Sequence, residues 1–443
     1  MNIEQRFSSF FSEHGTEDVE AQVPDMAGAA RGKVLPARKF GSGEMKMPEG
    51  IFAQIISGDY VPNKENVEDR DMFLVPDPDT LRPVPWAIEP AASIFLDCLR
   101  PNGEPVHSSP RQVLQDVVNL YRENGWNPVV APEVEFYLLA PHSDPSAEVE
   151  PPEGRLGRTE ATKQPYSIDM MNDFEPFIND VYRFCEEQGI YIDTLLQEMG
   201  PAQFEINFLH GKPLTLADQV FLFKRTVREA AIKHEMHATF LAKPMTEEAG
   251  SSLHIHQSVV DDKGENIFSD ANGERSEYFY GFLGGLQKYL PEAFLVFAPY
   301  PNSYRRFLSN WAQPVNLEWA VDNRTVGLRV PDSTPEARRI ENRVGGADLN
   351  PYLGIAATLA CGYLGMKEGL RPSEELTGSA YDTPFKLHRD LYSAIQAFES
   401  STAMKSTLGN EFVDLYSAVK RTENDEFQEI VTPWEREILM FNV

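Results

Sequence analysis

Carboxylates and imidazoles occur in this sequence two residues apart, inside segments that are otherwise apolar. Glu133 and Glu135 flank Val134, and His254 and His256 flank Ile255. In an extended strand such pairs point to one face. Neighbouring carboxylates repel each other unless a cation lies between them, and neutral imidazole is a common metal ligand. The spacing indicates a metal site, although a solvated strand edge or a polar strand face would show the same pattern.

Two further motifs bring acids and bases close together. Glu198 and Glu205 lie on either side of a Gly-Pro turn, and Glu341 lies two residues before Arg343. Each motif is weak alone, because surface acids and ion-pair clusters are common. Arginines also gather within 302–307 and 323–329. Their forked guanidinium groups match carboxylate and phosphate oxygens, so they indicate an anionic-ligand site or simply balance nearby acids.

The combined donor set, glutamates with histidine, suits Mg²⁺ or Mn²⁺ bound together with a nucleotide, and therefore phosphoryl transfer. Its oxygen-rich character argues against a structural zinc site. The sequence contains neither a P-loop motif nor the protein-kinase signature, so the nucleotide must be held in another way.

Composition narrows the class of protein. The 443 residues carry 40 Lys and Arg against 68 Asp and Glu, a formal charge of −28. Such a surface repels phosphate backbones, so we expect no nucleic-acid partner. The three cysteines show no C-x-x-C spacing, which favours a reducing, cytoplasmic location. The longest apolar stretch, within 353–364, is too short to span a bilayer, so no membrane partner is expected.

The expected elements divide the chain near residue 110. Residues 1–110 are rich in Pro and Gly and poor in helical periodicity, with short strands expected at 50–56 and 72–76. A helix is expected to begin at Ser109, followed by Pro110, and to end at Gly125. We therefore expect an N-terminal domain over 1–110 and a catalytic domain over 111–443.

Strands and helices alternate beyond this boundary, and the expected strands carry the acids and histidines. The pattern predicts strands over 129–139, 203–209 and 252–260. It predicts helices over 173–187, 215–236 (capped by Thr215), 278–290 and 352–367. The segments 141–166 and 368–387 have the composition of loops.

Together these motifs resemble the glutamine synthetase family. The matching stretches follow the family's order and span about two thirds of the chain: APEVEF (131–136), QEMGPAQFEINF (197–208), AGSSLHIHQS (249–258), NSYRRF (302–307), NRTVGLRVP (323–331), RRIENR (338–343) and NPYL (350–353).

The resemblance implies two divalent cations, Mg²⁺ or Mn²⁺, together with ATP and L-glutamate. The implied ligands are Glu135, Glu198 and Glu205 for the first cation and Glu133, His254 and Glu341 for the second. The implied nucleotide contacts are His256, Ser258 and Arg339, with Arg324 and Arg329 on phosphate. The implied substrate positions are Gly250, His254, Arg306 and Arg343, and the implied catalytic residues are Arg324, Arg343 and Glu341.

The resemblance also implies a fold and an assembly. The fold is α+β, a small N-terminal β-grasp domain followed by a catalytic domain with a curved antiparallel sheet and flanking helices. The assembly is a homo-oligomer, a dodecamer of two stacked hexameric rings with active sites between neighbouring subunits.

Three departures from the family pattern bear on the substrate. The family's flap glutamate, which helps to bind and deprotonate ammonium, is replaced by Ala312. The stretch 51–58, which corresponds to the family's Asp-Gly-Ser-Ser motif, contains no acid, and Ala249 replaces an asparagine. Losing two acids removes a favourable site for a small cation, so we expect an amine larger than ammonia.

This variant pattern resembles the γ-glutamylpolyamine (γ-glutamylputrescine) synthetase branch, as does the run of Asp25, Gly28 and 31–33. A diamine would want a distal carboxylate, whereas a monoamine would prefer apolar walls such as Phe52, Ile55 and Trp311. The expected activity is ATP-dependent joining of the glutamate γ-carboxylate to such an amine through γ-glutamyl phosphate. The alternatives are an ordinary glutamine synthetase that uses ammonia, or a non-catalytic relative.

Overall fold

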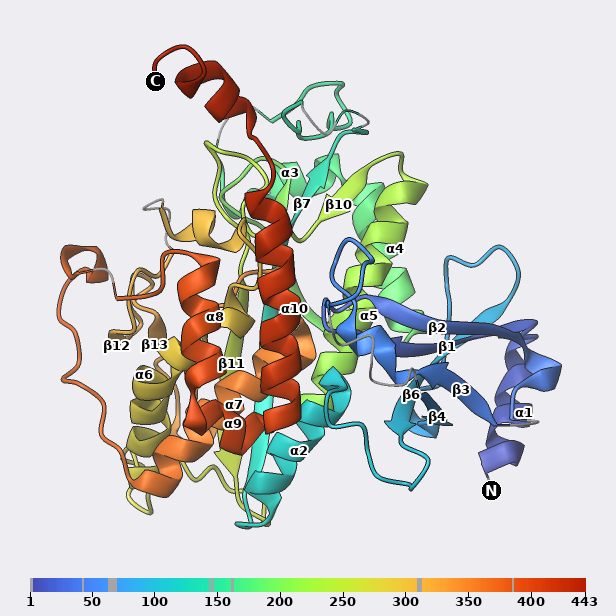
Figure 1. Cartoon of the computed structure of the whole chain (residues 1–443), viewed down its shortest axis with the longest axis horizontal. Helices are drawn as coiled ribbons and strands as arrows, with labels where there is room; N and C mark the ends of the chain where they lie inside the picture. The colour runs from blue at the N-terminus through green and yellow to red at the C-terminus, as the bar shows by residue number, and fades with distance from the viewer. Residues whose placement is uncertain are drawn as a thin grey trace.

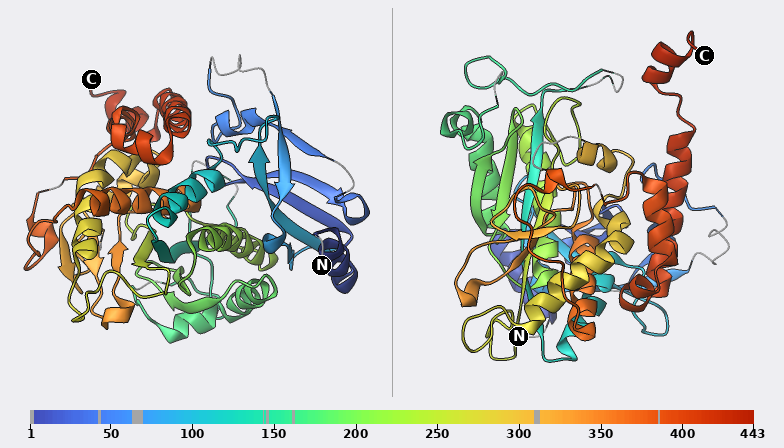
Figure 2. Two further views of the ribbon diagram at one scale, coloured as in Figure 1. Left: turned by 90° about the horizontal axis from the view of Figure 1, so that it is seen from below. Right: turned by 90° about the vertical axis from the view of Figure 1, so that its left-hand side faces the viewer.

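Two β-sheets organise the chain, as Figure 1 shows for the computed structural model. The structure describes residues 3–41, 44–62, 70–142, 144, 147–160, 163–308, 313–384 and 386–443. One sheet is built from strands before residue 100 and the other from strands after residue 126. Figure 2 shows the N-terminal sheet lying beside the larger, helix-rich part of the chain.

The N-terminal sheet is mixed. Within the described residues it has six strands in the order β2-β1-β6-β4-β3, with β5 added on β6. Strands β1 and β6 run parallel, and the other pairs run antiparallel. The elements are α1 (Ile3–His14), β1 (Asp18–Pro24), β2 (Ala30–Pro36), β3 (Met45–Pro48), β4 (Asp71–Pro76), β5 (Arg82–Pro83) and β6 (Ala91–Leu99).

Two expectations for this region are wrong. The strand expected at 50–56 is a 3-10 helix, η2 (Glu49–Ala53), followed by a turn. Within 50–56 the buried side chains of Phe52 and Ile55 are three residues apart, as in a helical turn. The N-terminal part also contains a helix, α1, that packs Phe7 against Phe40. The strand expected at 72–76 is confirmed as β4.

The second sheet carries the acids and histidines singled out in the sequence. Within the described residues it has eight strands in the order β12-β13-β14-β11-β7-β9-β8, with β10 paired to β7. All its pairs are antiparallel except β12 with β13. The strands are β7 (Asn127–Leu139), β8 (Ile192–Gln197), β9 (Gln203–Phe208), β10 (His237–Thr239), β11 (Leu253–Val260), β12 (Trp319–Val321), β13 (Leu328–Val330) and β14 (Ile340–Asn342). The expected α+β fold class is confirmed.

The helices after residue 100 are α2 (Pro110–Arg122), α3 (Ile168–Asp173), α4 (Glu175–Glu187), α5 (Pro213–Lys233), α6 (Glu277–Phe297), α7 (Pro351–Glu368), α8 (Leu391–Ser400), α9 (Thr402–Leu408) and α10 (Asn410–Gln428). Helices α2, α4, α5 and α7 lie within a few residues of their expected ranges, and α6 continues beyond its expected end at residue 290. Helices α3, α8, α9 and α10 were not predicted from the sequence. Thr215 is not the cap of α5, because that helix already begins at Pro213. The helix expected at 173–187 breaks at Phe174, the N-cap of α4, which begins at Glu175 with Pro176 in its first turn. No helix of the described residues is both long and apolar enough to cross a membrane.

Arg111 ties the N-terminal sheet to the rest of the chain. Its guanidinium is 3% exposed and contacts Asp77 at 2.6 Å, Asp97 at 2.5 Å and Asp218 at 3.2 Å. These acids lie on both sides of residue 110, which lies at the start of α2. A buried cation with several carboxylate partners is satisfied only in one arrangement of its neighbours. The domain boundary near residue 110 stays a prediction.

Candidate active site

Strand register brings the sequence motifs onto one part of the central sheet. Glu133 lies opposite His254 across β7 and β11, and Glu135 lies opposite Glu205 across β7 and β9. His256 lies opposite Glu341 across β11 and β14. Because paired residues in neighbouring strands share a face, residues more than 200 positions apart in sequence meet here.

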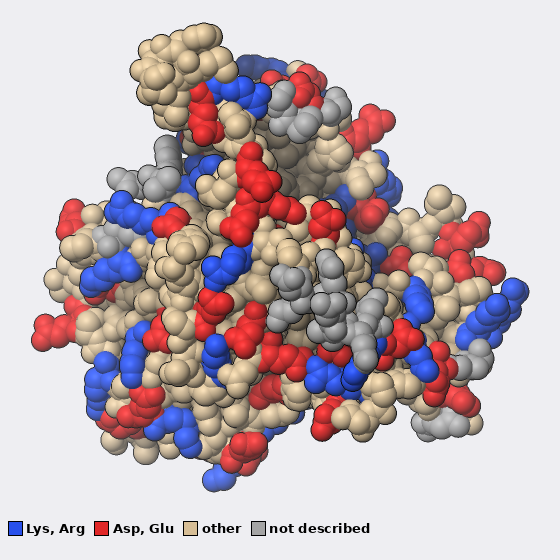
Figure 3. All heavy atoms as spheres, in the orientation of Figure 1, with Lys and Arg blue, Asp and Glu red and all other residues tan. Residues whose placement is uncertain are grey.

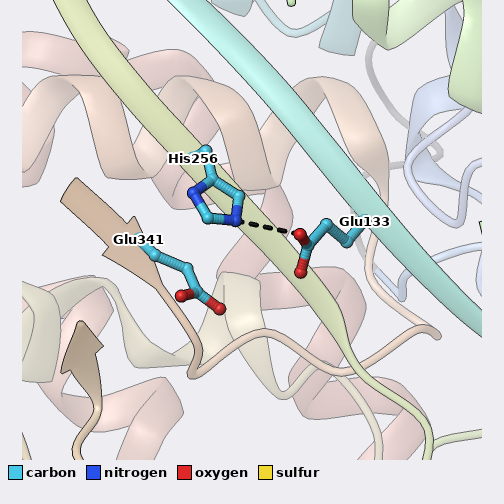
Figure 4. Close-up of side chains that lie close together, drawn as sticks. All are labelled: Glu133, His256 and Glu341. Atoms are coloured by element: carbon cyan, nitrogen blue, oxygen red, sulfur yellow. Dashed lines mark hydrogen bonds and ion pairs between the residues drawn. The ribbon is translucent and has the colours of Figure 1, made fainter. Parts of the chain in front are cut away.

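The side chains form three overlapping groups of possible metal ligands. In each group the ligand atoms lie within 4.8 Å of one another, and the groups are Glu135, Glu198 and Glu205, then Glu133, Glu205 and His254, then Glu133, His256 and Glu341. Figure 4 shows the last group, with His256 turned toward Glu133. All six residues expected to bind metal are therefore close together. His256, expected on the nucleotide, shares this cluster.

Glu133 links the two histidines. Its Oε2 lies 3.3 Å from Nδ1 of His254, and its Oε1 lies 3.0 Å from Nε2 of His256. Arg339 Nε donates to Nδ1 of His256 at 3.3 Å. Nδ1 therefore accepts a hydrogen bond, and the N–H at Nε2 donates one to Oε1 of Glu133.

The carboxylates differ strongly in ionisation. Burial, followed by the charge of Glu198, raises the pKa of Glu135 to about 8. Burial and the surrounding glutamates raise the pKa of Glu205 well above its ordinary value. Burial acts the same way on Glu133, but hydrogen bonds from His254 and His256 outweigh it and lower its pKa. Burial, then Arg343, lowers the pKa of His254 to about 4, leaving its ring neutral and able to bind a metal.

This donor chemistry fits divalent cations. Glu135, Glu198 and Glu205 supply only oxygen, which hard cations such as Mg²⁺ prefer. Burial raises the pKa of each of the three. A cation bound between these three carboxylates would offset the repulsion among them and displace protons from their oxygens.

Arginines surround Glu341, which is fully buried on β14. Its Oε2 accepts from Arg329 at 2.9 Å and its Oε1 from Arg343 at 2.6 Å. Burial opposes ionisation, but Arg343, His256 and His254 together outweigh it and lower the pKa of Glu341 to about 2. Arg324 is exposed in the turn before β13, and no hydrogen bond or ion pair joins it to another described residue. Its charge nevertheless lowers the pKa of Glu198, opposing the effect of burial.

Arg306, expected to contact glutamate, is buried below the surface of the site. It is fully buried, and its two Nη atoms donate to the backbone of Val344 and Arg343 and to the hydroxyl of Ser252. Its buried Nε has no partner among the described residues. Gly250 permits this packing, because a Cβ there would lie 2.8 Å from Arg306 Cγ. Contact of either residue with glutamate stays a prediction.

A cavity of about 660 Å³ opens beside the acidic cluster. It is lined by Glu133 and by the expected nucleotide residues His256, Ser258 and Arg339. Its volume is that of a small-molecule site. Asn207 and His210 also line it and were not named from the sequence, where Asn207 lies within the stretch 197–208 and His210 two residues after its end.

Two of the expected apolar walls, Phe52 and Ile55, are 0% and 1% exposed in the packing of their own chain and do not line this cavity. Their contact with an amine stays a prediction. Their segment lies against α10, where the Ile56 N–H donates to Glu423 and the Ser57 hydroxyl donates to Glu426. Trp311 and Ala312 lie outside the described residues.

Comparisons with known proteins agree with this geometry. The family model described as "Glutamine synthetase, catalytic domain" matches residues 107–439. The gamma-glutamylputrescine synthetase PuuA of Escherichia coli is 35% identical over 438 residues, covering 96% of this chain and 92% of that protein. The glutamate–isopropylamine ligase of a Pseudomonas species is 33% identical over 442 residues, covering 96% and 95%.

A solved structure titled "Apo GmaS without ligand" has the same fold. It superposes with a TM-score of 0.84 at 27% identity, covering 97% of this chain and 98% of that one. The family model covers most of the chain, and the relatives and the solved structure cover nearly all of it. The acidic cluster lies within the part that the family model matches. The chain therefore belongs to the glutamine synthetase family and is a ligase of that family.

Proposed function

We propose that this ligase joins the γ-carboxylate of L-glutamate to an amine larger than ammonia, using ATP and a γ-glutamyl phosphate intermediate. The observation that carries the chemistry is the register of β7, β9, β11 and β14, which gathers buried carboxylates and histidines beside a cavity of about 660 Å³. Phosphoryl transfer between two anions needs such a concentration of cation-binding groups.

Different residues of the chain would bind the nucleotide, its phosphates and glutamate. His256, Ser258 and Arg339 would hold the nucleotide, while Arg324 and Arg329 would orient its phosphates. Gly250, His254 and Arg343 would hold glutamate with its γ-carboxylate toward the terminal phosphate. Arg306, whose Nη atoms are bonded to Ser252 and to the backbone of Arg343 and Val344, would support this part of the site from below. The terminal phosphoryl group passes to a γ-carboxylate oxygen and ADP leaves. An uncharged amine then attacks the acyl carbon, the C–O bond to phosphate breaks, and inorganic phosphate leaves. The attacking nitrogen gives up one proton, to the departing phosphate or to solvent, as it becomes the amide nitrogen.

Two cation positions complete this arrangement. Glu135, Glu198 and Glu205 would hold one Mg²⁺ or Mn²⁺, and Glu133, His254 and Glu341 the other. When bound, these ions neutralise the phosphate and carboxylate oxygens that must approach each other.

The preference for a larger amine is supported by sequence and by relatives. The stretch 51–58 has no acid, Ala312 stands at the flap position, and a small cation therefore loses two carboxylates. Two of the relatives carry names that specify putrescine or isopropylamine as the amine. Charge favours this reading over an ordinary glutamine synthetase, since ammonium binding depends on such acids.

A phosphate-release assay with an amine panel tests the proposal. The full-length protein with ATP, Mg²⁺ and glutamate should release phosphate with particular amines and little with ammonia. Equal turnover with ammonia and with every amine would identify an ordinary glutamine synthetase. Absence of turnover with all of them would favour a non-catalytic relative.

We also propose that the chain assembles with copies of itself, as the family resemblance implies. Residues 430–443 project from the body in Figures 1 and 2, and the outer tip of this segment is mostly uncharged in Figure 3. Among them Trp434, Phe441 and Val443 are 59%, 86% and 97% exposed. An exposed apolar segment of this kind marks an interaction site.

Light scattering coupled to size-exclusion chromatography tests the assembly. The wild-type chain should elute as a large oligomer, up to a dodecamer, and a Trp434→Ser/Phe441→Ser variant should shift to smaller species. Ile88→Ser is the matched control, because Ile88 is 99% exposed on the N-terminal part. A monomeric wild type would overturn the proposal.

A further inference from the structure

Gln203 is a buried polar residue with no role in the steps described above. It opens β9 and is 1% exposed. In sequence it lies between Glu198 and Glu205, the two acids that the motif contributes to the cluster. Buried amides persist where their hydrogen bonds are satisfied, so its partners indicate what it does.

The amide of Gln203 contacts three separate segments. Its Nε2 lies 3.4 Å from Oε2 of Glu135 on β7. The same nitrogen lies 3.1 Å from the carbonyl of Gly250 and 3.4 Å from the hydroxyl of Ser251. Its Oε1 accepts from the Gly200 N–H at 2.9 Å. These partners determine the amide orientation, since the nitrogen faces oxygens and the oxygen faces an N–H.

The first consequence concerns the Glu135 carboxylate. Its Oε2 accepts from Gln203 and, at 2.7 Å, from the Ser252 N–H. These contacts aim the carboxylate and leave Oε1 without a hydrogen-bond partner among the described residues. That oxygen remains available to a cation.

The second consequence concerns the turn that carries Glu198. The Gly200 N–H is buried in this turn and is satisfied by the Gln203 side chain. The backbone closes the same turn, with Glu198 N donating to Gln203 O at 2.8 Å and Gln203 N donating to Gly200 O at 3.1 Å. Ala202 adopts φ 51° within it. An unpaired Gly200 N–H would destabilise this conformation and move Glu198.

We infer that Gln203 is a positioning residue that holds Glu135 and Glu198 as one cation-binding pair and couples that pair to the Gly250–Ser252 segment. The inference rests on the proposed function, which gives the first cation to Glu135, Glu198 and Glu205 and glutamate to Gly250. Partners that orient metal ligands change metal affinity by about 10- to 100-fold when they are removed.

Mn²⁺ binding to the full-length protein, measured by calorimetry and by the electron paramagnetic resonance of free Mn²⁺, tests this role. Gln203→Met keeps the volume and removes the amide, and should weaken one Mn²⁺ site about 10-fold or more. It should also raise the KM for glutamate while changing the KM for ATP less than 2-fold. Should Q203M not fold, Gln203→Asn withdraws the amide by one methylene and should weaken the same site.

Gln188→Met is the matched control. Gln188 is 2% exposed and its Nε2 donates to Phe184 O and to Thr226 Oγ1, within the helical layer. Both variants lose a buried amide, so a merely structural role predicts equal Mn²⁺ affinity in the two. Equal affinity while wild-type protein binds Mn²⁺ and turns over amines would overturn the inference alone. Failure of wild-type protein to bind Mn²⁺ would overturn the proposed function as well.

Discussion

Glu135 and Glu205 face each other across β7 and β9, and both are buried, at 6% and 8% exposure. Like charges directly opposite in a sheet are destabilising. The pKa of each is raised, first by burial and then by neighbouring glutamates. The raised pKa values favour protonation, which reduces the repulsion between these two carboxylates, and a cation bound between them would reduce it in the same way.

Divalent metal should therefore stabilise the protein. At a concentration 100 times its Kd, Mn²⁺ should add about 2.7 kcal/mol to the free energy of unfolding, seen as a rise in Tm by scanning fluorimetry. Glu205→Gln removes a shared ligand of two groups and should abolish most of that rise. Glu13→Gln, an exposed change on α1, should keep it. An equal rise in wild type and E205Q would contradict this ligand assignment.

Glu341→Gln should lower phosphate release about 100-fold or more. The change keeps the size of a fully buried side chain but removes the charge that Arg329 and Arg343 share. One Mn²⁺ site should weaken in calorimetry with the same variant. Full activity with unchanged metal occupancy would refute a role for Glu341 in the cluster.

Arg324→Ala should lower kcat about 100- to 1,000-fold without lowering Tm. The side chain is exposed and is not paired with another described residue, so the fold does not depend on it. Arg38→Ala, an exposed change on the N-terminal part, should leave both kcat and Tm unchanged. Loss of Tm in R324A would assign the residue a structural part instead.

Stability should rise with pH above neutrality because of Lys224. Burial, followed by the charge of Arg228, lowers the pKa of Lys224 to about 7, while Asp348 opposes this shift. The unfolded lysine titrates near 10.5, so between pH 7 and 10.5 the unfolded state binds more protons than the folded state. The free energy of unfolding then rises with pH by at most about 1.4 kcal/mol per pH unit from this group.

Denaturant unfolding at pH 7 and 8.5 measures that slope. Lys224→Met should flatten it relative to wild type, because the variant has no titrating group there. The neutral amine can still donate to Ala347 O and Leu349 O, its two backbone partners. Identical slopes in the two proteins would show that Lys224 does not titrate in this range.

Ala312→Glu should raise turnover with ammonia relative to larger amines, because it restores an acid at the flap position. Ala312→Gln is the matched control, of similar size and without charge. The ratio of kcat/KM for ammonia to kcat/KM for the best amine measures the effect. If A312Q and A312E shifted this ratio equally, size and not charge would set amine choice.

The neighbouring strands β7, β9 and β11 of the central sheet could be predicted from sequence, because acids and histidines alternate with apolar residues in them. Strands β8, β10, β12 and β13 were not predicted. The stretch 50–56 could not, since its apolar residues fit a helical turn as well as a strand. Helix α1 was missed because its apolar face is completed by Phe40 of another segment. The role of Gln203 could not be predicted from the sequence, because the partners of its amide come from three segments that meet only in the folded chain.

The sequence alone determined which chemistry is available: oxygen and imidazole donors, arginines, and no acid in 51–58. Tertiary structure decided which donors lie close enough to share a cation and which arginines remain exposed. Register joins Glu135 to Glu205, and burial commits the Nη atoms of Arg306 to its own backbone and to Ser252 while Arg324 remains exposed. The physical reason is that ionisation and hydrogen-bond partners depend on burial and on neighbours distant in sequence, and these are defined only when the strands pair.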